Sequence, residues 1–188
     1  MDTLTFGLQL CVQHPAHDDM GKRLAETIEQ VNLARDIGFD SIVLGQHYLS
    51  SPLQMMQPVP LLARLAPESG DLKLVIGIVL AALANPVDVA EQIATLDVIT
   101  DGRVRLGLGL GYRAVEFDAF GVPKDQRLRR FIRNAKLITS LLAGDRVSHD
   151  APDIRLDDVG LTLRPQQTPA RRSGSAPTTT RRYAGPRA

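Results

Sequence analysis

The sequence contains little of what marks secreted, disulfide-linked or membrane proteins. Its 188 residues include one cysteine and no tryptophan. Because Cys11 has no partner in the chain, a disulfide scaffold is excluded and a reducing compartment is favoured. The longest apolar stretches, such as residues 74–84, are too short to span a bilayer, and the amino terminus lacks a basic region followed by an apolar run. We therefore expect a cytoplasmic protein with no membrane partner.

A strong net charge is also lacking, although the charges are unevenly placed. The chain has 22 Lys+Arg against 21 Asp+Glu, and its 44% hydrophobic content is ordinary for one globular domain with a sizeable core. Residues 164–188, however, contain arginines and no acid, and no Val, Ile, Leu, Met or Phe occurs from residue 166 onward. We predict a globular domain over residues 1–163 and a disordered basic tail over 164–188. The acidic body would repel a polyanion, so no nucleic-acid partner is predicted.

Strand and helix patterns alternate through the body. Strands are predicted over residues 4–10, 41–44, 72–81 and 103–110, the first of them buried, and helices over residues 22–37, 58–66, 86–100 and 125–143. The strands start roughly 30 to 40 positions apart, the period of a βα unit, which predicts an α/β protein with parallel strands. Four units fit either a doubly wound sheet or a (β/α)₈ barrel. A Rossmann fingerprint is rejected because its third glycine would fall on Tyr112.

In both architectures, ligands bind at the carboxyl ends of the strands. The residues just past the four strands are Gln9, Cys11, Gln13 and His14, then Gln46, His47 and Tyr48, then residues 81–85, and finally Gly109, Gly111, Tyr112 and Arg113. His47 is the strongest candidate because an imidazole there can exchange a proton near neutral pH. A histidine that is simply hydrogen-bonded in a loop explains the position equally well. The alternating glycines from Gly107 either permit close strand packing or let a planar ligand approach the backbone.

Two other candidate sites in the first loop carry less weight. His14 and His17 have a spacing that metal ligands use, but a polar loop rich in His and Asp is usually solvated, and no metal site is predicted. Cys11 has no neighbouring base that would make it a nucleophile, which favours a packed thiol.

A family resemblance rests on two motifs taken together. The segment 85–120 contains the pattern Ala-Thr-Leu-Asp, Gly-Arg, an alternating-glycine strand, an aromatic residue and Glu-Phe. The segment 37–48 (IGFDSIVLGQHY) adds a Gly-Phe-Asp-Ser strand that ends in a Glu-His-His type triplet, with Gln46 and Tyr48 replacing two of its members. In this combination the chain resembles the luciferase-like flavin or deazaflavin oxidoreductase superfamily.

The resemblance implies the amino-terminal half of a (β/α)₈ TIM barrel, with about four βα units. Its cavity would bind reduced FMN or a deazaflavin coenzyme and a small organic substrate, for monooxygenation or hydride transfer. Ile78, Val79, Leu80 and Ala81 would form a bulge that supports the flavin, often with a cis peptide not involving proline. His47 would be the catalytic acid or base, and Gly109 and Tyr112 would border the same pocket. The resemblance also implies a flavin reductase as a partner, and the open edges of a half barrel make a second copy of the chain another expected partner.

A complete barrel of this kind needs roughly 250 residues, so we expect a truncated chain. In the family, the segment matched by Arg164, Pro165, Gln167 and Pro169 continues into an apolar fifth strand, whereas residues 170–177 read ARRSGSAP. One permitted codon set for these residues, read two bases later, gives Ala-Pro-Val-Trp-Ile-Gly-Ala, which resembles that strand. We therefore expect a shifted reading frame near Pro169. The alternative to an enzyme is an inactive or self-associating half barrel with open edges.

Overall fold

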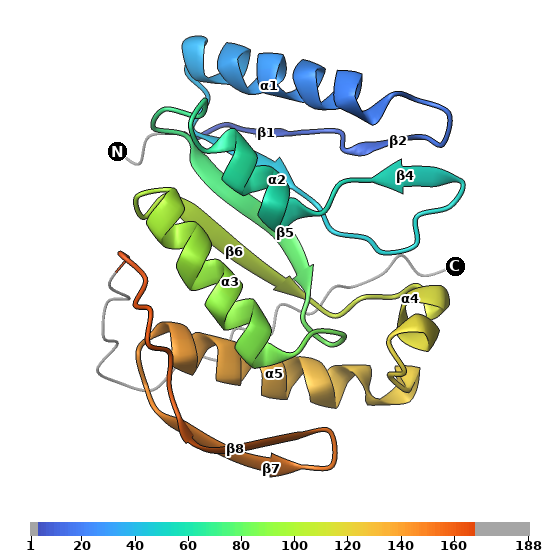
Figure 1. Cartoon of the computed structure of the whole chain (residues 1–188), viewed down its shortest axis with the longest axis vertical. Coiled ribbons are helices and arrows are strands. Elements are labelled where there is room, and N and C mark those ends of the chain that lie inside the picture. The colour runs from blue at the N-terminus through green and yellow to red at the C-terminus, as the bar shows by residue number, and fades with distance from the viewer. Residues whose placement is uncertain (1–3, 168–188) are drawn as a thin grey trace.

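The computed structural model describes residues 4–167. Its centre is a four-stranded parallel sheet in the order β1, β3, β5 and β6 (Figure 1). The strands are β1 (Gly7–Gln9), β3 (Ser41–Leu44), β5 (Lys73–Leu80) and β6 (Val104–Gly109). The four predicted strands and their parallel pairing are thus confirmed, and the α/β class with them.

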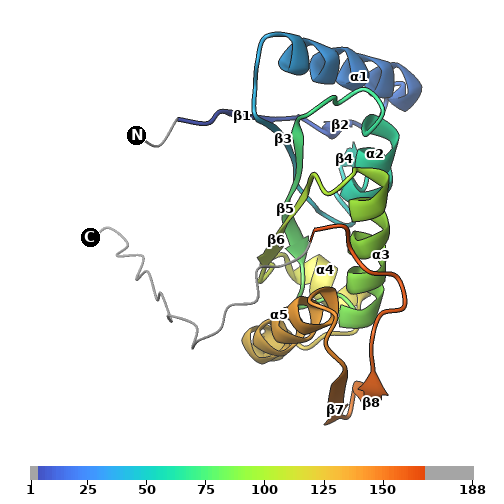
Figure 2. The ribbon, with the colours of Figure 1, turned by 90° about the vertical axis from the view of Figure 1, so that its left-hand side faces the viewer.

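Helices follow the strands and cover one face of the sheet (Figure 2). They are α1 (Met20–Asp36), α2 (Pro58–Leu65), α3 (Pro86–Ile99) and α5 (Arg127–Leu142), close to the predicted ranges. Asp19 and Asn85 cap α1 and α3 by accepting hydrogen bonds from first-turn amides. The strand order follows the chain order without reversal, and α1, α2 and α3 lie on one side. This winding differs from that of a doubly wound sheet, which reverses its strand order and has helices on both faces.

The main core lies between the sheet and these helices. Ile42 and Leu44 of β3 and Leu74 and Ile76 of β5 are fully buried there. The prediction that the first strand is buried was wrong: Leu4 and Phe6, just before β1, are 74% and 59% exposed. The strand lies at an edge of a sheet that helices cover on one face, so its other side contacts no second layer among the described residues.

The sequence patterns did not predict several short helices and strands. β2 (Gln13–Pro15) and β4 (Leu53–Met55) form an antiparallel pair, and β7 (Val147–Ala151) pairs with β8 (Ile154–Val159). The one-and-a-half-turn helix α4 (Ala114–Ala119) follows β6, and η1 (Lys124–Gln126) leads into α5. Strands of three residues are too short for an alternating pattern to stand out in the sequence.

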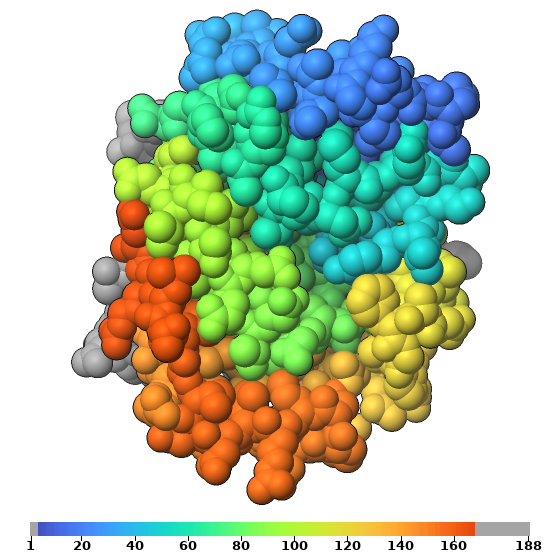
Figure 3. All heavy atoms as spheres, viewed as in Figure 1, coloured from blue at the N-terminus to red at the C-terminus, as the bar shows by residue number. Residues whose placement is uncertain are grey.

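The beginning of the predicted tail contacts the body. The side-chain amide of Gln167 donates to Asp97 Oδ1 at 2.5 Å and to the Val104 carbonyl at 2.8 Å. The orange-red segment that ends at residue 167 accordingly lies beside the green helix α3 (Figure 3). Contacts therefore continue past the predicted boundary at residues 163 and 164, while residues 168–188, with the predicted frameshift, lie outside the described residues. Among the described helices, none is long and apolar enough to cross a membrane.

Candidate functional site

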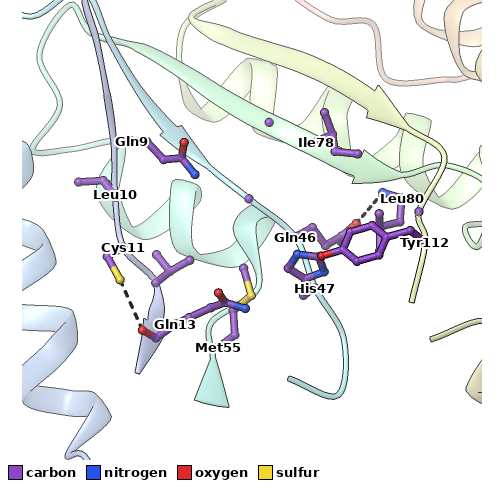
Figure 4. A pocket seen from close by; sticks show the side chains of 14 residues that line it. Gln9, Leu10, Cys11, Gln13, Gln46, His47, Met55, Ile78, Leu80 and Tyr112 are labelled. Carbon is purple, nitrogen blue, oxygen red and sulfur yellow. Dashed lines mark hydrogen bonds between the residues drawn. The ribbon is translucent and has the colours of Figure 1, made fainter. Parts of the chain in front are cut away.

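A cavity of about 560 Å³ opens at the carboxyl ends of the parallel strands (Figure 4). It is lined by Gln9, Leu10, Cys11, Val12, Gln13, Gly45, Gln46, His47, Met55, Gly77, Ile78, Leu80, Gly111 and Tyr112. These residues come from the ends of β1, β3, β5 and β6 and the segments that follow them, and from β4. The location is where parallel α/β folds bind their ligands.

One wall of the cavity is an irregularity in β5. The pairing of β5 with β6 shifts register between Ile76 and Val79, and the peptide bond between Gly77 and Ile78 is cis. A bulge was predicted in this strand over residues 78–81; the irregularity instead lies between Ile76 and Val79, so it includes Ile78 and precedes Leu80 and Ala81. The backbone after β5 is fixed by α5, because the side-chain amide of Asn134 donates to the carbonyl oxygens of Ala81 and Ala84 at 2.8 and 2.9 Å.

Gln46 connects the end of β3 to this irregular segment. Its Oε1 accepts a hydrogen bond from the Leu80 amide at 2.9 Å, and its Nε2 donates to the Tyr48 hydroxyl at 3.0 Å. The Leu80 donor fixes which end of the Gln46 amide is oxygen. Burial raises the pKa of the Tyr48 phenol, with smaller contributions from the negative charges of Asp88 and Glu116.

His47 lines the cavity with one edge and contacts a buried carboxylate with the other. Its Nδ1 lies 3.1 Å from Oε1 of Glu116, a residue with no exposed side-chain surface. The imidazole meets the Tyr112 ring edge-on, with centroids 5.9 Å apart and an angle of 85° between the planes. A histidine held in this way can exchange a proton with a ligand in the cavity.

The predicted site residues divide into two groups. His47, Ile78, Leu80 and Tyr112 lie together around the cavity. Val79 and Ala81 are buried in the core, at 4% and 0% exposure, and Gly109 lies beneath the Ile78 side chain. Sequence reasoning missed the cavity-lining residues Leu10, Val12 and Met55 and the carboxylate of Glu116. The Glu-Phe motif marked Glu116 in the sequence, but nothing there indicated that it would contact His47.

The remaining sequence candidates are placed as follows. The prediction of a packed Cys11 thiol was wrong: Cys11 is exposed at the rim of the cavity, and its Sγ lies 3.4 Å from the Gln13 carbonyl oxygen. The cause is again the uncovered side of the edge strand. Within residues 4–167, no group of three or more His, Cys, Asp or Glu side chains could hold a metal ion.

Comparison with known proteins identifies the family. Residues 4–187 match the family described as luciferase-like monooxygenase. The chain belongs to this family. The resemblance inferred from the two motifs is thereby confirmed.

Individual relatives have different activities. The chain is 26% identical over 166 residues to a 5,10-methylenetetrahydromethanopterin reductase of Methanolobus tindarius, a match that covers 88% of the chain and 47% of that protein. The solved structure of the monooxygenase RslO1 from Streptomyces bottropensis is 29% identical, with a TM-score of 0.78 over 87% of the chain and 50% of that protein.

A third protein of known structure shares the fold at lower sequence identity. The oxygenating constituent of 3,6-diketocamphane monooxygenase of Pseudomonas putida, solved in complex with FMN, is 18% identical with a TM-score of 0.70 over 80% of the chain and 42% of that protein. The chain spans about half the length of the curated relatives it matches.

Proposed function

We propose that this chain is the flavin-binding, amino-terminal half of a luciferase-like oxidoreductase that acts on a small organic substrate. The observation that carries the proposal is the cavity at the strand ends, which is lined both by His47 and by Ile78 of the β5 irregularity (Figure 4). Monooxygenases and a reductase among the similar proteins support an oxidoreductase, and the FMN complex among the similar folds supports a flavin.

The residues around the cavity fit an isoalloxazine ring. Gly45, Gly77 and Gly111 contribute no side chains, so the walls there consist of backbone that a planar ring can approach. Leu10, Val12, Met55, Ile78 and Leu80 supply apolar contacts, as small-molecule sites commonly do. The side-chain amides of Gln9 and Gln13 can hydrogen-bond to the polar edge of a flavin or deazaflavin ring.

Three of the cavity side chains would then have distinct roles toward a bound flavin. Bound FMN would supply oxygen activation and a deazaflavin would supply hydride transfer. Ile78 and Leu80 would support the ring from the β5 side and exclude water from it. His47 would hold or accept a proton at the imidazole nitrogen that Glu116 does not use.

Flavin binding by the full chain tests this proposal. We expect FMN, or coenzyme F420 as the deazaflavin probe, to lose fluorescence on titration with the protein. The single thiol gives a second readout: a bound flavin should slow the reaction of Cys11 with a thiol reagent, because Cys11 lines the cavity. His47→Ala should weaken binding, whereas His17→Ala, at a side chain that is 87% exposed, should leave it unchanged. If neither flavin binds, or if both variants bind like the parent, the site assignment fails.

The alternative function is an inactive or self-associating half barrel. Leu4 and Phe6 support it, because these large apolar side chains are exposed beside the edge strand β1. A monomer that unfolds cooperatively and binds flavin would contradict the alternative, whereas concentration-dependent association without flavin binding would favour it. Sequencing the gene beyond the codon for Leu163 tests the proposed frameshift, since four further βα units should follow in the shifted frame.

A further inference from the structure

Glu116 is a fully buried acidic residue outside the cavity, and three nitrogens converge on one of its carboxyl oxygens. Its Oε1 lies 2.9 Å from the Tyr48 amide nitrogen, 3.1 Å from His47 Nδ1 and 3.3 Å from Arg113 Nη1. Its Oε2 is buried and has no hydrogen-bond partner among the described residues. A buried carboxyl group is costly to leave unpaired, and the Arg113 guanidinium and the other two nitrogens are the partners that Oε1 has here.

The same network fixes the backbone that carries His47. Arg113 donates from Nη1 to the Tyr48 carbonyl at 2.7 Å and from Nη2 to the Leu49 carbonyl at 3.0 Å. From the opposite side, Nε2 of Gln57 donates to the His47 carbonyl at 2.9 Å. The segment 47–49 is therefore held from two elements, and the imidazole ring adds a third point of attachment at Glu116.

The contact with Glu116 determines which ring nitrogen carries the proton. Oε1 already accepts from the Tyr48 amide and from Arg113 Nη1, and an oxygen in this setting is an acceptor, so His47 Nδ1 makes the 3.1 Å contact as a donor. A neutral imidazole then has its lone pair on Nε2, the nitrogen that remains for a ligand in the cavity. A carboxylate bonded to the other ring nitrogen selects tautomers in the same way in other proton-transfer sites.

We propose that Glu116 is a positioning residue that fixes the orientation and the Nδ1–H tautomer of His47, so that Nε2 faces the cavity as a proton acceptor. This inference rests on the proposed function for its purpose, but its test does not depend on flavin binding. Glu116 touches no cavity surface itself and acts through His47. The i, i+3 partner Arg113 pairs with the same carboxyl oxygen at 3.3 Å.

Nitrogen NMR of the imidazole rings tests the tautomer directly. Long-range proton–nitrogen correlations of the ¹⁵N-labelled full chain, recorded in alkaline solution where imidazoles are neutral, distinguish Nδ1–H from Nε2–H, and His47→Asn assigns the signal. We expect the Nδ1–H form to dominate by roughly tenfold or more, the value of a hydrogen bond to a charged group. An Nε2–H form in the parent protein would overturn the proposal without any need for a variant.

Two substitutions separate positioning from a merely structural role. Glu116→Gln retains a neutral acceptor where Oε1 stands, and should keep most of the Nδ1–H form. Glu116→Ala removes the acceptor and should shift the population toward Nε2–H by a similar factor. Asp118→Ala, at an exposed acid of the same helix, is the matched control and should change nothing. If Glu116→Ala folds and leaves the tautomer unchanged, Glu116 does not set it. An Nε2–H spectrum of the parent overturns the proposal whether or not Glu116→Ala folds, so the proposal stays testable.

Discussion

The Ile78 side chain occupies the space above Gly109. A Cβ added to Gly109 would lie 1.6 Å from Ile78 Cδ1, and one added to Gly107 would lie 2.9 Å from the Ile76 carbonyl oxygen and 3.1 Å from Ile78 Cγ2. Two of the alternating glycines in β6 thus make room for the residue that follows the cis peptide in β5. Gly111, by contrast, has a φ of +75° and itself lines the cavity. The glycine pattern serves strand packing at Gly107 and Gly109 and backbone exposure to the cavity at Gly111.

Gly109→Ala should therefore displace Ile78 and distort the β5 wall of the cavity. Because the clash is with a side chain in a packed setting, we expect a loss of about 1–3 kcal/mol in the free energy of unfolding, together with weaker flavin binding. Urea denaturation and FMN titration measure the two effects.

Gly45→Ala is the matched control for this substitution. Its Cβ would come no closer than 3.7 Å to the Gly77 carbonyl oxygen, an ordinary contact. The free energy of unfolding should therefore stay close to that of the parent chain. Flavin binding should weaken, because Gly45 lines the cavity. If Gly109→Ala is as stable as Gly45→Ala, Ile78 can move aside without cost.

Much of the fold could be predicted from the sequence because its signals are local. The spacing of the βα units and the Asn85 cap each depend on residues near one another in the chain. Burial could not be predicted for the first strand, because Leu4 and Phe6 would be core residues only if another layer covered them.

The site could be predicted only in part for a similar reason. The rule that ligands bind at strand ends located His47 and Tyr112. The family resemblance added Ile78 and Leu80. It could not separate Val79 from its neighbours, since the irregular register of β5 decides which side chains face the cavity and which face the core. The pairing of His47 with Glu116, 69 positions apart in the sequence, is visible only in the folded chain.

Gln46 should stabilise the cavity wall by accepting the hydrogen bond of the Leu80 amide. Leu80 is 3% exposed, so Gln46→Leu would leave its buried N–H without an acceptor and should cost about 1–3 kcal/mol of stability. Flavin binding should weaken as well, because Leu80 lines the cavity.

Gln46→Glu is the informative comparison. A carboxylate retains an acceptor for Leu80, and the Tyr48 hydroxyl can donate to its second oxygen. We expect this variant to stay closer to the parent than Gln46→Leu in both denaturation and FMN titration. Equal losses in the two variants would show that the Leu80 hydrogen bond is not what Gln46 contributes.

Asp153, between β7 and β8, makes the stability of the chain depend on acidity. Hydrogen bonds from Arg133, at 2.5 and 2.8 Å, and the charge of Arg130 lower the pKa of this carboxyl to about 2. A carboxyl whose pKa is lower in the folded than in the unfolded chain stabilises the fold above about pH 4, and this contribution is lost as the pH falls toward 2.

Asp153→Asn should remove that contribution. We expect a loss of about 1 kcal/mol at neutral pH, less than the full pKa shift implies, because solvent screens a side chain that is 35% exposed. The difference from the parent should shrink as the pH drops from about 4 to about 2. Urea midpoints at several pH values measure this, with Asp150→Asn, an exposed acid on β7, as the control. A loss that stays constant with pH would mean that the ion pairs are not its source.

Gln167 should anchor the segment after β8 to the body through Asp97. The Asp97 side chain is 1% exposed, and it accepts hydrogen bonds from the Gln167 backbone amide at 2.9 Å and from its side-chain amide at 2.5 Å. Gln167→Ala keeps the first bond and removes the second, which leaves one buried carboxylate oxygen without that donor and should cost about 1–3 kcal/mol. Gln166→Ala, at the exposed neighbour, should cost almost nothing. Thermal unfolding of the two variants therefore measures how far the packed body extends beyond residue 163: equal melting temperatures would mean that residues 164–167 contribute no stability.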